Sequence, residues 1–81
     1  MNEKIIKTVR FNYIKDIYHL IEMSSHLKEP AYIWQGKSIV NASSIMGVFS
    51  IDPSENFKIH YDYDPEFDKF ISLFEVEKME N

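Results

Sequence analysis

The chain contains no cysteine, few glycines and prolines, and fewer basic than acidic residues. Without cysteine it can form no disulfide and has no thiol nucleophile or thiolate metal site, which fits a reducing compartment. The formal net charge of −4 disfavours nonspecific nucleic-acid binding, because phosphate contacts need clustered Lys and Arg. No apolar run approaches the roughly 20 residues that cross a bilayer, and residues 1–9 are too charged for a signal peptide. We therefore expect a cytoplasmic protein that binds neither nucleic acid nor membrane.

The length and composition predict one globular domain that spans residues 1–81. The chain is 44% hydrophobic and 27% charged, which is typical of a globular protein with its own core. At 81 residues that core is thin, so each large apolar side chain matters for stability. The three prolines and two glycines lie far apart between patterned segments, so they mark turns and not a linker.

The first half of the chain predicts a strand, a helix and a hairpin. Residues Glu3–Val9 are rich in β-branched side chains, which favours a strand. From Tyr13 to Leu27 the apolar residues follow helical spacing, and Asn12 is the predicted N-cap. The predicted buried stripe is Ile14, Ile17, Tyr18 and Ile21. Two extended runs, Ala31–Trp34 and Ser38–Asn41, predict a hairpin in which Gly36 takes a positive φ.

The second half predicts a short helix, a strand and a last helix. The short helix begins near Ser44 and runs to about Ser50, with Asn41 or Ser43 as its cap. Asp52-Pro53-Ser54 turns the chain, and strict alternation then predicts a strand whose buried residues are Phe57, Ile59, Tyr61 and Tyr63. Asp64 caps the last helix and Pro65 begins it, with an apolar stripe of Phe67, Phe70, Ile71 and Phe74.

This order of elements predicts a two-layer α+β domain with a mostly antiparallel sheet. Each helix buries one stripe and each strand one face, so the second face of the sheet is expected to be open to water. Tyr32 and Trp34 are candidates for that open face, where exposed aromatic side chains could mark a dimer or partner surface.

Three short motifs follow one another in the middle of the chain: Gly36-Lys37, Val40-Asn41 and Ser44-Ile45-Met46-Gly47-Val48. Together with the element order and the length, this run resembles HPr, the small phosphocarrier of the bacterial sugar phosphotransferase system. Element order and length agree over nearly the whole chain, whereas strong motif identity is confined to residues 36–51. The resemblance implies an open-faced β-sandwich, with three helices on one face of a four-stranded sheet. It also implies that Ser44 occupies the position phosphorylated by HPr kinase.

The chain departs from HPr where the family places its phosphoryl-accepting histidine. With one extra residue at the hairpin, Asn12 falls at that position, and without it Tyr13 does. An asparagine amide nitrogen is delocalised and not nucleophilic, whereas a neutral imidazole has a free lone pair. The nearest histidine, His19, would lie roughly 10 Å further along the helix. We therefore expect a protein that is not an enzyme, with no catalytic residue and no cofactor.

The predicted regulatory residue is Ser44, and the predicted partner-binding residues are Ile45, Met46, Phe49 and Asn12. A phosphate on Ser44 would add about −1.5 to −2 charges at the edge of an apolar surface. The resemblance implies a protein partner: HPr kinase, enzyme I or a regulator of the catabolite-control type. In a simpler interpretation Ser43-Ser44 only caps the helix, and Ile45 and Phe49 pack under the sheet edge.

Two other functions stay open at this point. One is a working phosphocarrier in which a different residue accepts phosphate. The other is an orphan domain that keeps the HPr fold for an unrelated partner or for self-association as a homodimer. The histidines suggest no further chemistry: His19, Glu22 and His26 share a helix face, but residues seven apart are too distant for one ion without another ligand. We expect a solvated polar face there, an exposed His60 and no metal site.

Overall fold

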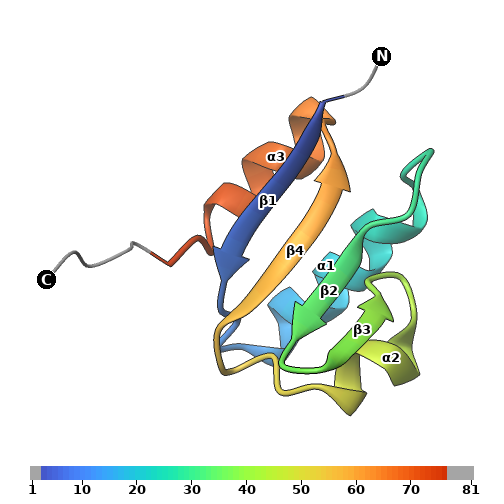
Figure 1. The fold of residues 1–81 in the computed structure, drawn as a ribbon. Helices are drawn as coiled ribbons and strands as arrows, with labels where there is room; N and C mark the ends of the chain where they lie inside the picture. The colour runs from blue at the N-terminus through green and yellow to red at the C-terminus, as the bar shows by residue number, and fades with distance from the viewer. Residues whose placement is uncertain (1–2, 77–81) are drawn as a thin grey trace, which may run out of the picture.

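The computed structural model describes residues 3–76, in which four strands and three helices form an α+β fold. The elements are β1 (Lys4–Val9), α1 (Ile14–Ser25), β2 (Tyr32–Gln35), β3 (Ser38–Asn41), α2 (Ile45–Ser50), β4 (Phe57–Asp62) and α3 (Pro65–Ser72). Their order and type are those predicted from the sequence. The helices lie behind one face of the sheet, and the face toward the viewer is uncovered (Figure 1). Among the described residues, no helix has the length and apolar character needed to cross a membrane.

The sheet is antiparallel at every pair of neighbouring strands, in the order β1-β4-β2-β3. Strands β2 and β3 form the predicted hairpin, and Gly36 takes a φ of 58° in its turn. Glycine suits this position because it has no Cβ to clash in the left-handed region. Strand β4, which is distant in sequence from β1, lies between β1 and the hairpin (Figure 1).

Alternation along β4 separates the two faces of the sheet. Phe57, Ile59 and Tyr61 are buried against the helices, as predicted, whereas Lys58 is exposed. Tyr63, predicted to share the buried face, lies after the strand and is 49% exposed. It follows the last pair of the β1–β4 ladder, where the chain leaves the strand and turns toward the start of α3 at Pro65.

The aromatic part of the core centres on Phe11, which lies between β1 and α1 and is fully buried. Its ring stacks on Phe74 with a centroid distance of 4.1 Å and on Phe57 at 5.9 Å. Its backbone N–H donates to the carbonyl oxygen of Pro53 at 2.9 Å. These contacts hold the chain in an irregular path before α1, so that the helix begins only at Ile14.

The buried stripe of α1 differs from the predicted one. Ile17 and Ile21 are buried as expected, and Leu20 and Ser24 complete that side of the helix. Ile14 and Tyr18 are 63% and 51% exposed, which contradicts the predicted burial. The apolar spacing identified the helix correctly, but it could not show which of two adjacent apolar stripes faces the sheet.

The predicted N-cap of α1 is also wrong. Tyr13 occupies the N-cap position, and no side chain there accepts a hydrogen bond from the first turn. Asn12 is one residue too early because the burial of Phe11 fixes the chain just before it.

The last helix matches its prediction closely. The Oδ1 atom of Asp64 accepts a hydrogen bond from the backbone N–H of Phe67 at 3.0 Å, and Pro65 begins the helix. The buried residues are Phe67, Phe70 and Ile71, with Phe74 partly buried after the helix ends. The chain then runs beside β1, where the N–H of Val76 donates to the carbonyl oxygen of Thr8 at 2.8 Å.

Candidate protein-docking site

Helix α2 begins at a serine that caps it directly. Ser44 has an extended backbone, and its Oγ accepts a hydrogen bond from the N–H of Gly47 at 2.9 Å. The predicted caps Asn41 and Ser43 are therefore wrong. Asn41 Oδ1 instead accepts from the N–H and the hydroxyl of Ser43, at 2.8 and 2.7 Å. The Ser43 hydroxyl proton is thus held by Asn41, whereas Ser44 uses its oxygen as an acceptor.

Gly47 brings the start of α2 close to both Ser44 and β3. A Cβ at this position would lie 3.1 Å from Ser44 Oγ and 3.2 Å from the Cβ of Val40. Both distances are shorter than ordinary van der Waals contact, so a larger residue would displace Ser44 or β3. The absence of a side chain at Gly47 therefore leaves the space in which Ser44 and β3 approach the first turn of α2.

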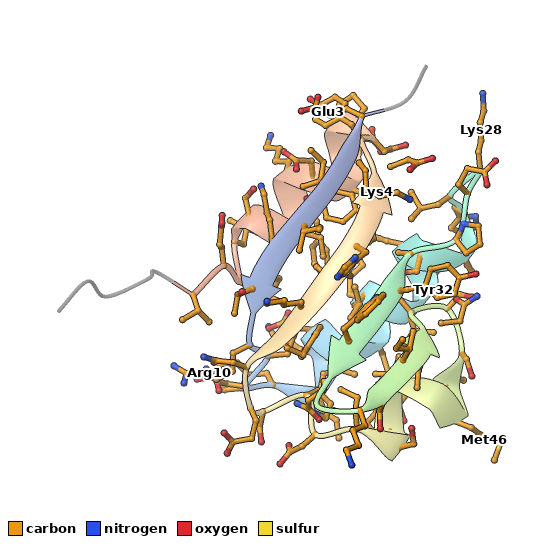
Figure 2. The ribbon with its side chains drawn as sticks, viewed as in Figure 1. Glu3, Lys4, Arg10, Lys28, Tyr32 and Met46 are labelled. Carbon is orange, nitrogen blue, oxygen red and sulfur yellow. The ribbon has the colours of Figure 1, made fainter. Side chains whose placement is uncertain are left out.

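Three large apolar side chains of α2 face solvent. Ile45 is 55% exposed, Met46 85% and Phe49 41%, and Val48 is the buried residue that anchors the helix. Met46 extends into solvent at the end of the molecule formed by α2 (Figure 2). The interpretation in which Ile45 and Phe49 pack under the sheet edge is therefore wrong, because Val48 fills that place.

Tyr18 extends this apolar surface from α2 onto α1. Its ring centroid lies 5.6 Å from that of Phe49, at an interplanar angle of 54°. Sequence reasoning placed Tyr18 in the core because its spacing fits the helical stripe. We call the group formed by Tyr18, Ile45, Met46 and Phe49 the α2 surface; its side chains are between 41% and 85% exposed. Exposed apolar side chains gathered in this way are typical of a protein-interaction site.

Asn12 lies in a different place from the rest of the predicted partner-binding set. It lines an open hollow of about 520 Å³ between the start of α1 and the chain after α3, together with Arg10 and Asp16. Glu75 also lines this hollow. Two carboxylates disfavour a phosphate beside Arg10 because like charges repel. No histidine is among the described residues that line it.

The histidines of α1 occupy a polar face, as expected. His26 Nε2 lies 3.7 Å from a carboxylate oxygen of Glu22, and both side chains are exposed. His19 packs its ring against Phe70 with centroids 4.6 Å apart. Within residues 3–76, no group of three His, Cys, Asp or Glu side chains could hold a metal ion.

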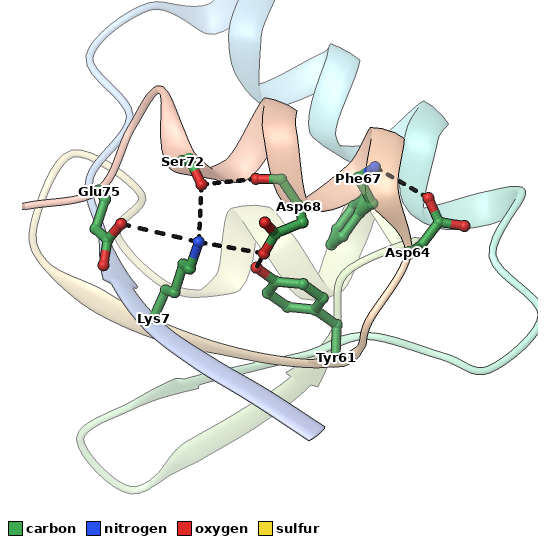
Figure 3. A network of polar contacts seen from close by, with 7 residues as sticks. All are labelled: Lys7, Tyr61, Asp64, Phe67, Asp68, Ser72 and Glu75. Atoms are coloured by element: carbon green, nitrogen blue, oxygen red, sulfur yellow. Dashed lines mark hydrogen bonds and ion pairs between the residues drawn. The ribbon is translucent and has the colours of Figure 1, made fainter. Parts of the chain in front are cut away.

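The best-connected polar cluster ties β1 and β4 to α3 (Figure 3). Tyr61 Oη donates to Asp68 Oδ1 at 2.6 Å, and Lys7 Nζ lies 3.2 Å from the same oxygen. Lys7 also donates to Ser72 Oγ at 2.7 Å. The hydrogen bond from Tyr61, aided by Lys7, lowers the pKa of Asp68, and burial followed by the Asp68 hydrogen bond raises the pKa of Tyr61. The donors and acceptors of this cluster are paired with one another, which is typical of a network that stabilises the packing of α3 on the sheet.

Comparison of the chain with protein-family models, with curated proteins and with solved structures gives no match.

Proposed function

We propose that the protein is a non-catalytic HPr-like interaction module, which binds a partner protein through the α2 surface and is switched by phosphorylation of Ser44. The HPr-like fold is supported by an antiparallel four-stranded sheet whose helices lie on one side (Figure 1). The observation that carries the proposal is the capping serine immediately beside three exposed apolar residues of the same helix.

A phosphate on Ser44 is compatible with the local structure. The Oγ atom already points at the N–H of Gly47, and phosphate oxygens can accept the same kind of hydrogen bond. Helix α2 has no acidic residue in its first turn, so the added charge meets no like charge there. The modification therefore changes the charge beside the α2 surface while the helix stays folded.

The partner must present an apolar surface to the α2 surface and, for the phosphorylated form, a cation near Ser44. HPr kinase, enzyme I and a catabolite-control regulator are the partners that the resemblance to HPr suggests. Enzyme I is expected to leave the chain unphosphorylated, because an amide at Asn12 cannot accept a phosphoryl group.

Incubation with HPr kinase and ATP, followed by mass spectrometry, tests the switch. We expect one phosphate on the wild type and on Ser43→Ala, and none on Ser44→Ala. A parallel incubation with enzyme I and phosphoenolpyruvate is expected to give no acid-labile phosphate. An unmodified wild type would refute the switch, and an acid-labile phosphate would instead favour a working phosphocarrier.

A further inference from the structure

The uncovered face of the sheet has an aromatic centre formed by β2 and β4. Trp34 stacks on His60, with ring centroids 4.6 Å apart and an interplanar angle of 13°. Trp34 is 43% exposed and Tyr32 40% exposed, and both lie on this face because they alternate with the buried Ile33. Figure 2 shows Tyr32 on the uncovered side of the sheet. His60 is half-buried and not exposed as predicted, because the indole ring covers it. Because Trp34 stays partly exposed despite this stack, part of the indole ring is available to a ligand.

A hollow of about 330 Å³ lies next to Trp34 at the end of β2. Its lining includes Thr8, Lys58 and Asn56, the residue just before β4. Among the described residues, no side-chain hydrogen bond or ion pair engages Thr8 Oγ, Lys58 Nζ or the Asn56 amide. The hollow therefore combines an aromatic wall with one cation and two neutral hydrogen-bonding groups, none of which is engaged by another side chain within residues 3–76.

The rim of the hollow is held in place before any ligand arrives. Gln35 Nε2 donates to the carbonyl oxygens of Asp52 at 2.8 Å and Asn56 at 3.3 Å. Gln35 Oε1 accepts from the N–H of Asp52 at 2.8 Å. These bonds connect β2 to the loop before β4. Little conformational entropy is therefore lost in ordering this part of the site when a ligand binds.

The hollow has the size of a small-ligand site, because its volume lies within the range of roughly 300–1,000 Å³ that such sites occupy.

We propose that this hollow, the Trp34 hollow, binds a small planar aromatic ligand that carries one anionic group. The ring stacks on the free face of Trp34, and the anion pairs with Lys58 and accepts hydrogen bonds from Thr8 or Asn56. Aromatic nucleotides and aromatic carboxylates share this chemistry. The Trp34 hollow belongs to the open face of the sheet, so its occupancy is independent of the proposed role of the α2 surface.

Nuclear magnetic resonance titration tests the proposal, because the single tryptophan gives one indole N–H signal. Adenosine monophosphate is expected to move this signal saturably, and adenosine to bind about tenfold more weakly because it lacks the anion. Inorganic phosphate alone should leave the signal in place. Comparison of naphthoate with adenosine monophosphate shows whether a carboxylate can replace the phosphate. Tighter binding of either anion than of adenosine supports the shared chemistry.

Lys58→Gln is expected to weaken adenosine monophosphate about tenfold and adenosine hardly at all. Lys15→Gln is the matched control, because it removes the same charge from α1 and should leave both affinities unchanged. Trp34→Leu should abolish the binding of both adenosine monophosphate and adenosine. Binding to this variant is followed through the Gly36 N–H signal, in a spectrum that also confirms folding. The proposal is overturned by a Trp34 signal that no probe moves saturably, by equal effects of the two lysine variants, or by a Trp34 signal that depends on protein concentration and so reveals self-association.

Discussion

The rings of Tyr18 and Phe49 lie 5.6 Å apart and connect α1 to α2 on the surface of the molecule. Aromatic pairs of this kind contribute about 0.5–1.5 kcal/mol beyond their buried area. We expect Tyr18→Ala and Phe49→Ala to show a coupling near the lower end of that range, because both rings are partly exposed. Urea unfolding of the two single variants and the double variant measures it. Strictly additive effects would show that the two rings do not support each other.

Ser44→Ala is expected to lower the free energy of unfolding by about 1 kcal/mol, because Gly47 N–H loses its acceptor. Ser44→Asp should retain most of the stability, since aspartate is an equally good cap. Ser43→Ala is the control and should cost less, because Asn41 Oδ1 still accepts from the backbone N–H of residue 43. Thermal unfolding of the three variants measures the differences. Equal losses at both serines would contradict the capping role of Ser44.

Asp68→Asn is expected to destabilise the protein by about 2 kcal/mol at neutral pH, because Tyr61 and Lys7 lose a charged acceptor. The pKa of Asp68 is lower in the folded than in the unfolded protein, so its stabilisation is full above the ordinary carboxyl pKa. That stabilisation is lost as the pH falls below about 4. Denaturant unfolding at several pH values should therefore show the wild type and Asp68→Asn converging in acid. A difference that stays constant with pH would rule out this tie.

Protonation of His60 is expected to destabilise the protein and to quench Trp34. Burial, together with Lys4 and Lys58, lowers the pKa of His60 below 6.5, so the unfolded state takes up the proton first. Stability from His60 is thus full above pH 6.5 and is lost as the pH falls through its folded-state pKa. Tryptophan fluorescence should drop with a midpoint below 6.5, and His60→Gln should remove that transition. A midpoint at or above 6.5 would contradict the lowered pKa of His60.

The sequence was sufficient to predict the elements, because local signals mark them. Alternation around Ile59 identified β4, and Asp64-Pro65 located the start of α3. The exposed triad Ile45, Met46 and Phe49 was also predictable, since so short a helix cannot bury three large side chains on one side.

Features that depend on tertiary packing could not be predicted. Tyr18 has the same helical spacing as a core residue, and only the position of α2 leaves it exposed beside Phe49. The wrong cap at Asn12 has the same kind of cause, because the burial of Phe11 delays the start of α1. The stacking of His60 on Trp34 joins two strands that lie far apart in the sequence, so alternation alone suggested exposure.

Isothermal titration calorimetry with HPr kinase tests the α2 surface most directly. The wild type is expected to bind, and Met46→Lys to bind at least about tenfold more weakly, because it places a charge in the apolar contact. Ile6→Lys, at a 55% exposed position on the uncovered sheet face, is the matched control and should bind as the wild type does. Met46→Lys that binds as tightly as the wild type, or a wild type that does not bind, would contradict the proposed docking role.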